Sequence, residues 1–491
     1  MRFRLIFLAP VLAFIALGSW AVASPVGSSP DDDFHLDSIW CASANNDACL
    51  PGTDSTTRVV PLALLKTPCY AFHDEKSAEC QVPYLESDLA PDTLTDRGNF
   101  QGAYPPVYYS TMSVFAGPGV ESSVLIMRVL SIVLFIGLTS LLFALLPLRR
   151  RPTLIWGWLI TTVPLGLFLI ASNNPSGWAV IGVGTAWIAL LGYYETSGRT
   201  RAALAGLFLI SVLMAAGSRG DSAFYVLFAI GVVLFLKYAR DRAFFLASIL
   251  PLAAALVALA FFVLSSQVGS GIHGFSNQVS GEPAPGAEYG RFSVLAHNLL
   301  NLPYLLTGVF GGWGLGWLDT AMPSIVLWGS GAAFIAVGFH GLAKMDRRKA
   351  VAVSGVVTLL VALPLYVLFK GNDPVGANVQ PRYLLPLIVL LGGLLVMESN
   401  GRRIQFGRAQ TTVLLVALSV SNLVALHTNI RRYVTGSDQQ GLNLNANTEW
   451  WWSMPLSPMM VWIAGSLAYA GTIWILVREV SSDRTLEPIK A

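Results

Sequence analysis

Long apolar stretches alternate with short charged segments along most of the chain. Twelve of these stretches are long enough to cross a membrane, because about 20 apolar residues span roughly 30 Å of hydrocarbon. The pattern predicts an all-α polytopic membrane protein with about 12 transmembrane helices. The approximate centres of the predicted helices are Phe14, Leu134, Gly166, Thr185, Phe208, Ala229, Leu256, Gly331, Leu359, Leu391, Val416 and Leu467.

Composition supports the same class of protein. Hydrophobic residues make up 54% of the 491 residues and charged residues only 12%, whereas soluble domains are about one quarter charged. A chain with so few charged residues cannot cover its surface in water, so a soluble globular protein is excluded. We expect no nucleic-acid partner, because the basic residues are spread over many short loops instead of forming one patch.

The basic residues mark one side of the membrane. If the N-terminus is cytoplasmic, about two thirds of the 31 Lys and Arg residues lie in inner segments, but only about a quarter of the 28 Asp and Glu residues do. Basic clusters fall on alternate loops, as the positive-inside rule requires. We therefore predict a multi-pass protein of the plasma membrane with both termini in the cytoplasm.

This orientation gives the predicted organisation of the chain. The segment before Ser24 also resembles a secretory signal, with a small-residue cleavage site at Ala23 as the alternative to a retained helix. The predicted parts are a first transmembrane helix in 1–23, an extracytoplasmic loop in 24–120, helices two to seven in 121–266, a second extracytoplasmic loop in 267–323, helices eight to twelve in 324–478 and a cytoplasmic tail in 479–491.

All four cysteines lie in the predicted extracytoplasmic loop 24–120. Four cysteines allow three pairings, and the short separations favour Cys41 with Cys49 and Cys69 with Cys80. Disulfide bonds persist only in an oxidising compartment. The cysteines therefore agree with the charge distribution in placing this loop outside the cytoplasm.

The other outer segments contain aromatic residues. Residues 269–291 are rich in Gly, Pro and Ser and predict a mobile loop. The apolar stretch that follows is broken by Pro303 and several glycines, which favours a re-entrant or interfacial helix with its tryptophans at headgroup level. Trp450 to Trp452 predict an aromatic belt, with a sugar-binding platform as the alternative.

The sequence SSPDDDFHLDSIW places acidic residues directly after the first predicted helix. Ser29, Pro30 and Asp32 have the spacing of a helix start, with Ser29 as N-cap, proline in the first position and a capping acid three residues later. Asp31 and Asp32 would then lie in the first turn, where the helix dipole favours negative charge. The motif therefore predicts a short helix that begins in the outer loop.

Helical spacing also groups these acids into two faces. Asp31, Asp32 and His35 can share one face, whereas Asp33 and Asp37 fall together on a neighbouring face where like charges favour solvent. Two interpretations remain open at this point. The motif is either a capped helix start with solvated acids, or an acid–base pair that takes part in chemistry.

Several short motifs occur in an order that matches known membrane enzymes. PDDDFH contains Asp31, Asp32 and His35, and the others are YPPVYY (Tyr104 to Tyr109), MRVLS (Arg128), NNPSGWAV after the third predicted helix and VQPRYLLPL (Val379 to Leu387). On these motifs the chain resembles the GT-C glycosyltransferase superfamily. More closely, it is similar to a bacterial family of polytopic membrane proteins, with a domain of unknown function, that is grouped with those enzymes.

Two positions depart from the pattern of that family. The site of a usual Pro-Asp pair reads Asn174-Pro175-Ser176 and lacks the acid, and Asp32 stands where Glu is common. The resemblance covers roughly residues 30 to 400. It implies an enzyme of a bacterial plasma membrane that moves a sugar from a polyprenyl-phosphate donor to a cell-envelope glycan or lipid acceptor, with inversion at the anomeric carbon.

The resemblance also implies roles for particular residues. A carboxylate of the first outer loop would be the general base, and we favour Asp31 over Asp32, with His35 beside them. The same two carboxylates could instead hold a divalent cation such as Mg²⁺ or Mn²⁺. Arginines would hold the phosphate; the candidates are Arg128, Arg219, Arg291 and Arg382. The residues expected to line the cavity or bind the acceptor are Tyr104, Tyr108, Asn174 and Tyr383.

Simpler interpretations exist for some of these arginines. Arg219 could pair locally with Asp221, and Arg291 could be a solvated loop charge. Two other classes of function also stay open. One is a transporter or flippase of envelope precursors, although no internal repeat is evident. The other is a non-catalytic scaffold with a GT-C-like fold, which the missing acid at Asn174 would suit.

Overall fold

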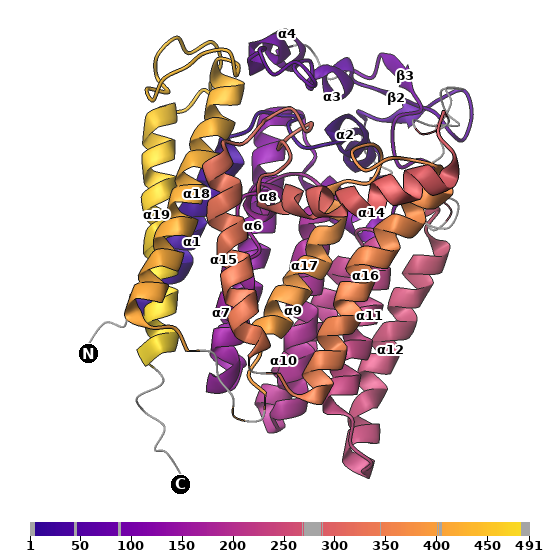
Figure 1. The fold of residues 1–491 in the computed structure, drawn as a ribbon. Helices are drawn as coiled ribbons and strands as arrows, with labels where there is room; N and C mark the ends of the chain where they lie inside the picture. The colour runs from indigo at the N-terminus through magenta and orange to yellow at the C-terminus, as the bar shows by residue number, and fades with distance from the viewer. Residues whose placement is uncertain are drawn as a thin grey trace.

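The computed structural model describes residues 5–43, 47–86, 90–267, 269, 286, 288–343, 345–399, 401 and 405–482. Its long helices run side by side in one bundle (Figure 1). Within these residues, ten helical segments are long and apolar enough to cross a membrane, which confirms the all-α polytopic fold. They are η1 with α1 (Leu5–Leu8 and Ala9–Val22), α6 (Val120–Leu145), α9 (Pro175–Glu195), α10 (Gly198–Ala216), α11 (Gly220–Lys237), α12 (Arg242–Leu264), α15 (Ser324–Leu342), α16 (Arg347–Gly371), α18 (Arg408–Val434) and α19 (Pro458–Ser482).

Two of the twelve predicted helices differ from this pattern. The helix predicted around Gly166 is broken into α7 (Arg151–Leu159) and α8 (Leu165–Ile170), so a continuous third span was wrong. Pro164 stands directly before α8, and proline lacks the amide hydrogen that a continuing helix needs. The helix around Leu391 is α17 (Pro381–Val396), which is apolar but has only 16 residues.

The centre of the bundle is α9, whose membrane-length window is completely buried. It packs against α6, α8, α10, α11 and α17. Gly182 permits the close crossing with α10, because a Cβ atom placed there would lie 2.5 Å from the amide nitrogen of Ala215. Small residues at such crossings let helix backbones approach closely.

The chain between α1 and α6 forms a small lobe at one end of the bundle (Figure 1). Its three strands pair antiparallel in the order β1-β2-β3. Disulfide bonds join Cys41 to Cys49 and Cys69 to Cys80, as the short separations predicted. The elements of the lobe are α2 (Asp32–Trp40), β1 (Leu50–Pro51), β2 (Arg58–Val60), α3 (Leu62–Lys66), η2 (Ala78–Gln81), α4 (Val82–Leu85), β3 (Thr93–Thr95), α5 (Pro106–Met112) and η3 (Ser113–Phe115).

A buried arginine ties the Cys69–Cys80 segment to the bundle. Arg432, near the end of α18, donates to the carboxylate of Asp319 (2.9 Å) and to the backbone oxygens of Tyr70 (2.9 Å) and Lys76 (2.5 Å). Asp319 also accepts a hydrogen bond from the amide of Phe72 (3.1 Å). The lobe is therefore fixed against both α18 and the second outer loop.

The segment expected to be re-entrant or interfacial forms α14 (Arg291–Thr307) and η5 (Gly308–Phe310). Figure 1 shows α14 lying across the ends of the long helices. The tryptophans after it face the protein instead of lipid, since Trp313 and Trp317 are buried and the Trp317 indole donates to the carbonyl of Gly27 (2.9 Å). The mobile loop predicted for residues 269–291 lies largely outside the described residues.

The three adjacent tryptophans also differ from their predicted role. An aromatic belt would expose its indoles to the lipid interface, but Trp450 and Trp452 are buried and pack against each other with ring centroids 5.3 Å apart. The Trp452 indole donates to the carbonyl of Val22, at the end of α1 (2.8 Å). These residues therefore join the end of α1 to the segment that leads into α19.

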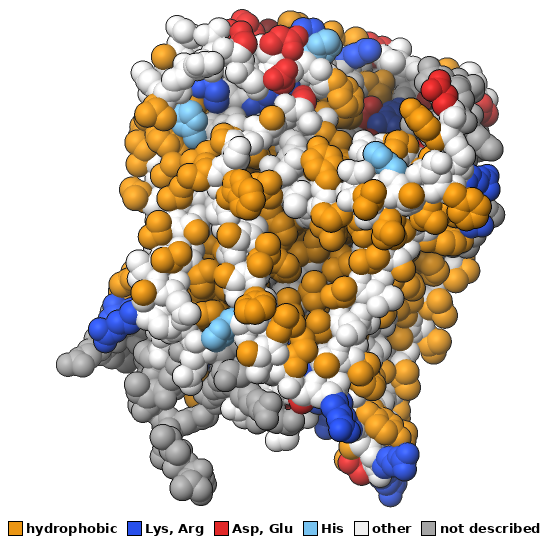
Figure 2. All heavy atoms as spheres, viewed as in Figure 1, with side chains coloured by type: hydrophobic (Ala, Val, Ile, Leu, Met, Phe, Trp, Pro, Cys, Tyr) orange, Lys and Arg blue, Asp and Glu red, His pale blue; other side chains and the backbone are white. Residues whose placement is uncertain are grey.

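Charged side chains gather at the two ends of the bundle. Figure 2 shows a broad apolar band around the middle of one face, with most of the acidic side chains on the lobe above it. At the opposite end η4 (Leu148–Arg150) precedes α7, and Glu195 forms ion pairs with Arg149 (3.2 Å), Arg150 (2.6 Å) and Lys237. The start of α1 and the end of α19 lie at this basic end (Figure 1).

Candidate functional site

Arg128 of α6 holds the chain that leads from α1 to α2. Its side chain is fully buried, and its two Nη atoms donate to the carbonyl oxygens of Ala21 (2.6 Å), Ser24 (2.5 Å) and Pro25 (2.6 Å). Both terminal nitrogens are thus occupied by backbone acceptors. The prediction that Arg128 binds a donor phosphate is corrected: Arg128 fixes the connector that positions the acidic motif.

The acidic motif begins with a turn instead of a helix. Asp31 precedes α2 and adopts a left-handed conformation with φ of 62°, which aspartate tolerates better than most residues other than glycine. The carboxylate of Asp32 reaches back to accept from the amide (3.0 Å) and hydroxyl (2.7 Å) of Ser29. The predicted helix start is therefore wrong: Asp31 and not Ser29 is the N-cap, and Asp32, the first residue of α2, closes the turn that precedes the helix.

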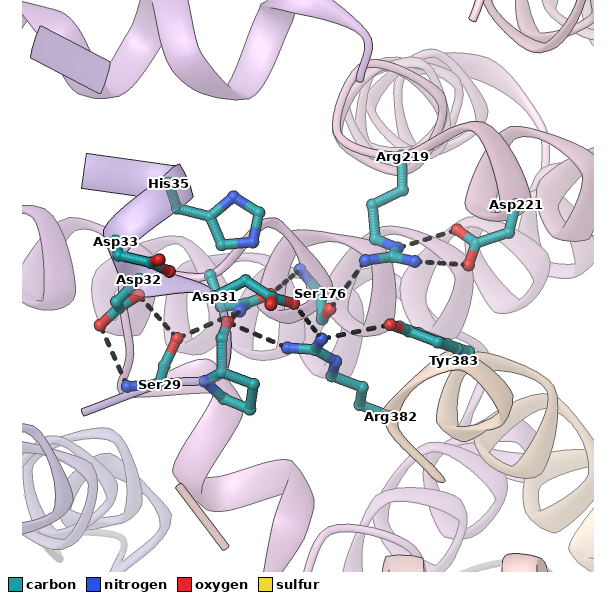
Figure 3. A network of polar contacts seen from close by, with 12 residues as sticks. Ser29, Asp31, Asp32, Asp33, His35, Ser176, Arg219, Asp221, Arg382 and Tyr383 are labelled. Carbon is teal, nitrogen blue, oxygen red and sulfur yellow. Dashed lines mark hydrogen bonds and ion pairs between the residues drawn. The ribbon is translucent and has the colours of Figure 1, made fainter. Parts of the chain in front are cut away.

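The left-handed turn separates the two candidate bases. The prediction that Asp31, Asp32 and His35 share one helix face is wrong, because α2 begins only at Asp32. Figure 3 shows the carboxylate of Asp31 directed toward Arg382, whereas that of Asp32 is directed toward Ser29. The two acids therefore lie in different environments, although they are adjacent in sequence.

Asp31 is bound by two arginines from distant parts of the chain. Arg382, at the start of α17, donates to one carboxylate oxygen (2.6 Å), and Arg97 of the outer lobe approaches the other (3.3 Å). Burial alone would raise the pKa of Asp31, but the Arg382 guanidinium, assisted by Arg97, lowers the pKa to about 2. The side chain is still 37% exposed, so an ionised carboxylate is accessible at the end of the bundle that carries the lobe.

Two buried arginines meet around the ring of Tyr383. The Arg219 guanidinium lies 4.7 Å from the ring centroid and that of Arg382 lies 5.1 Å from it. Arg219, the N-cap of α11, pairs with Asp221 through two hydrogen bonds (2.9 and 2.8 Å) and also donates to Ser176 at the start of α9 (3.3 Å). The local pair with Asp221 is therefore present, and Arg219 also joins the group around Asp31.

His35 completes the group on the side of the lobe. One ring nitrogen, Nδ1, lies 2.9 Å from the hydroxyl of Tyr109, and the ring meets that of Tyr104 edge to face. Burial lowers the pKa of His35 to about 3, although the neighbouring Asp31 carboxylate opposes this shift. His35 is therefore neutral at pH 7. Its Nε2 atom is buried and has no hydrogen-bond partner within the described residues.

Asp32 is enclosed and has no arginine partner among the described residues. Only 1% of the residue is exposed, and Ser29 supplies both hydrogen bonds to its carboxylate. Burial raises the pKa of Asp32 to about 7, although the hydrogen bonds from Ser29 favour the ionised form. Its carboxyl group is therefore partly protonated at neutral pH and is shielded from solvent.

Asn174 joins the acidic motif to α9. Its amide nitrogen donates to the Ser29 hydroxyl (3.1 Å) and the Pro30 carbonyl (2.9 Å), while its amide oxygen accepts from the backbone of Ser176 (2.9 Å) as the cap of α9. An ionised carboxylate at this position could not donate to Pro30 and would place a further acid close to Asp32. Asparagine at position 174 therefore satisfies hydrogen bonds that an aspartate could not make.

Two other candidates lie outside the group. Tyr108 is fully buried and packs edge to face against Trp178, with its hydroxyl unpaired among the described residues. Arg291 is exposed at the start of α14 and makes no contact with Asp31 or Arg382. Arg128, Arg291 and Tyr108 are therefore not brought together with the residues around Asp31.

Sequence reasoning missed the role of Arg97. This residue forms two hydrogen bonds to Asp33 (2.7 and 3.0 Å) in addition to its contact with Asp31. It is one of few arginines in the first outer loop, which is the only signal that could have identified it. Asp37 was expected in solvent but is completely buried, and burial followed by the nearby Asp33 raises the pKa of its carboxyl well above the ordinary value.

A narrow crevice lies beside Arg382, between the acidic motif and the segment that follows α14. The side-chain oxygen of Gln380 and the Nε atom of Arg382 are buried there without a hydrogen-bond partner among the described residues. Trp313 and Pro30 form part of the wall. The crevice has a volume of about 10 Å³, which is room for about one water molecule.

The residues around Asp31 do not fit the divalent cation that the two acids could have held. Asp31 accepts from arginines and Asp32 accepts from Ser29. Within the described residues, no three His, Cys, Asp or Glu side chains come close enough together to hold a metal ion. Hard cations need several oxygen ligands at one point, and these two carboxylates, which point to different partners, do not supply them.

Comparison with known proteins agrees with this membrane fold. No curated protein and no solved structure matches the chain. A family model described as "Predicted membrane protein (DUF2142)" matches residues 14–391. This match covers more than half of the chain and includes α1 from Phe14 onward, the acidic motif, Arg219 and Arg382. The protein therefore belongs to the DUF2142 family of membrane proteins.

Proposed function

We propose that this protein is a membrane glycosyltransferase that acts at the end of the bundle carrying the outer lobe. The donor would be a sugar linked to a polyprenyl phosphate, and the acceptor a hydroxyl group of a cell-envelope glycan or lipid. The proposal rests on one observation: the partly exposed carboxylate of Asp31 lies beside two buried arginines, with Arg382 2.6 Å away and Arg219 across the Tyr383 ring.

The two arginines suit a phosphate leaving group. Guanidinium groups stay charged and bind phosphate oxygens through pairs of hydrogen bonds. Arg382 is bonded to the Pro30 carbonyl (3.0 Å) as well as to Asp31, so its position does not depend on Asp31 alone. A phosphate between Arg382 and Arg219 would meet preorganised positive charge where negative charge develops during transfer.

Asp31 suits the role of general base. The acceptor oxygen would attack the anomeric carbon, its proton would pass to the Asp31 carboxylate, and the carbon–oxygen bond to phosphate would break with its electron pair on the phosphate. A single base is enough for such a direct displacement, which inverts the anomeric carbon. Asp32 is less suited, because it is buried beneath Ser29 and an acceptor hydroxyl cannot reach its carboxylate.

Phosphate binding would also activate Asp31. While Arg382 is bonded to it, the carboxylate is a weak proton acceptor, because Arg382 and Arg97 outweigh burial and lower its pKa to about 2. A donor phosphate would compete with Asp31 for the Arg382 guanidinium. The pKa of Asp31 would then rise toward the range in which a carboxylate accepts a proton during transfer. This couples donor binding to the strength of the base.

The test is a transfer assay with the purified protein in vesicles. We would supply a panel of polyprenyl-phosphate sugars carrying radiolabelled sugar, together with cell-envelope acceptors, and measure labelled product. Asp31→Asn should reduce transfer by about 10²- to 10⁴-fold, the usual loss when a general base is removed. Arg382→Lys should also reduce transfer, because an ammonium group cannot bind phosphate through the paired hydrogen bonds of a planar guanidinium.

The matched control is Asp96→Asn, which removes a carboxylate from an exposed position of the same lobe. This variant should retain full transfer, and all variants should elute as monodisperse protein. Transfer by Asp31→Asn at the wild-type rate would overturn the assignment of the base. If the wild type moves labelled lipid between leaflets without forming product, the protein is a flippase and the proposal fails.

A further inference from the structure

His35 takes no part in the proposed transfer step, although it is buried beside Asp31. Aromatic side chains enclose its ring: the Tyr104 ring meets it edge to face with centroids 5.5 Å apart, and the centroid of the Tyr109 ring lies 6.1 Å away. These contacts hold the imidazole in one orientation. Figure 3 shows the ring directed from α2 toward Asp31 and Arg219. The imidazole is therefore a fixed group at the edge of the proposed phosphate site.

The hydrogen bond between His35 and Tyr109 decides which ring nitrogen carries the proton. Among the described residues, the Tyr109 hydroxyl forms one hydrogen bond, with Nδ1 (2.9 Å), and Nε2 has no partner. If the hydroxyl donates to Nδ1, the proton of the neutral ring lies on Nε2, and only that N–H group is left unpaired. The opposite tautomer would leave two groups unpaired, the Tyr109 hydrogen and the Nε2 lone pair. The Nε2 atom is therefore a hydrogen-bond donor.

The surroundings of Nε2 indicate which acceptor it would take. A buried N–H group without an acceptor is costly. The charged side chains that act on the imidazole are the ones that form the site, namely Asp31, Arg97, Arg219 and Arg382. The two oxygens of Asp31 already accept from Arg97 and Arg382. An anion bound by the arginines would bring further oxygens, and one of them would complete the hydrogen bonding of His35.

A neutral donor suits a place beside the general base. Burial lowers the pKa of His35 to about 3, so at pH 7 the ring donates without carrying a charge. A cation here would form a further ion pair with Asp31, whose pKa is already about 2 because burial is outweighed by Arg382 and Arg97. A neutral imidazole can therefore bind an anion without weakening the base further.

We propose that His35 is a binding residue for the donor, and that its Nε2–H group donates a hydrogen bond to an oxygen of the phosphate held by Arg219 and Arg382. Tyr109 is a positioning residue, because its hydroxyl fixes the tautomer that makes Nε2 a donor. No proton moves to or from His35 in this step. This inference rests on the proposed function, since it takes the bound anion to be the phosphate of a polyprenyl-phosphate donor.

The test is the binding of farnesyl phosphate, a short polyprenyl phosphate without a sugar, to the full-length protein in detergent at pH 8. Thermophoresis measures the Kd. His35→Leu combined with Tyr109→Phe removes the donor and leaves no hydroxyl unpaired, so the fold should be kept. This double variant should bind about 10- to 100-fold more weakly, the usual loss of a hydrogen bond to a charged group.

Two matched variants separate a lost donor from a disturbed fold. His35→Gln keeps a neutral N–H donor on a side chain of similar reach and should bind within about threefold of the wild type. His73→Leu removes an exposed histidine of the same lobe, which pairs with Glu75 (3.4 Å), and should bind as the wild type does. Denaturant titration of each variant checks that its stability is retained.

The outcomes distinguish this inference from the transfer proposal. If the double variant binds as tightly as the wild type while Arg382→Lys binds more weakly, the role of His35 is overturned and the proposed function stands. A His35→Gln variant as weak as the double variant would also overturn that role. If binding follows the prediction but no sugar is transferred, the inference stands and the transfer proposal fails. A wild type that does not bind farnesyl phosphate would overturn both.

Discussion

Replacing Asp32 with asparagine is expected to stabilise this protein at neutral and alkaline pH. The buried carboxyl of Asp32 has its pKa raised from 3.8 to about 7, because burial disfavours the charged form. The folded state therefore holds the proton more tightly than the unfolded state. Its contribution to stability is fully present below pH 3.8 and is lost as the pH rises through 7.

The size of this effect follows from the shift itself. A difference of about three pKa units corresponds to about 4 kcal/mol between acidic and alkaline pH, at 1.36 kcal/mol per unit. Between pH 5 and pH 8 the wild type should lose about 2.5 kcal/mol from this group alone. Asparagine does not ionise and its oxygen can still accept from the Ser29 amide, so Asp32→Asn should avoid this loss.

The measurement is the free energy of unfolding of both proteins by denaturant titration, in one detergent, at pH 5, 6, 7 and 8. The stability of Asp32→Asn relative to the wild type should grow by about 2.5 kcal/mol from pH 5 to pH 8. Asp96→Asn, in which an exposed carboxylate is removed, should show no such trend. A constant difference across this range, or a less stable variant at pH 8, would refute the assignment of a buried, proton-holding Asp32.

Three further predictions concern the framework around the site. Arg128→Met should destabilise the protein by about 4 kcal/mol, because three buried carbonyls lose charged donors worth about 1.5 kcal/mol or more each; denaturant titration would measure this. Cys80→Ser should cost about 2–3 kcal/mol, since the bond closes a short loop of the lobe, and thermal unfolding with and without reductant would show it. Gly182→Ala should lower the melting temperature, because its new Cβ atom would lie 2.5 Å from the Ala215 amide, whereas Gly206→Ala, with open space around it, should not.

Each of these outcomes has a clear opposite. The control for Arg128→Met is Arg58→Met, because Arg58 donates only to backbone oxygens of its own turn. An equal loss of unfolding free energy in both variants would contradict the role given to Arg128 in holding the connector between α1 and α2. Cys80→Ser with unchanged thermal unfolding would show that the lobe does not need the bond. A Gly182→Ala variant as stable as Gly206→Ala would mean that α9 and α10 do not cross as closely as described.

Local pattern was sufficient for much of the fold. The helices of the bundle could be located because each is specified by the hydropathy of its own 20 residues or so. The disulfide pairing followed from short separations, since Cys41 and Cys49 are eight residues apart. The contact between Ser29 and Asp32 also followed from their spacing of three residues, although the helix begins at Asp32 and not at Pro30 as predicted.

The break between α7 and α8 was not found, although Pro164 marked it. Hydropathy does not distinguish a continuous helix from two short ones that are both buried. The same limit applies to Trp450 and Trp452, since an indole at an interface and an indole packed inside the protein give the same sequence pattern. Which surface a side chain faces depends on neighbouring helices.

The sequence by itself determined the class of protein, the number of apolar segments to within two, and the residues from which the candidate site is built. Only the tertiary structure decided what each of those residues does. The left-handed turn at Asp31 sends its carboxylate to Arg382, which is 351 positions away, while Asp32 is enclosed by Ser29. Arg128 is occupied by backbone carbonyls instead of a phosphate. The physical reason is that the partner of a buried charge is selected by which chains pack together, and no local spacing encodes that choice.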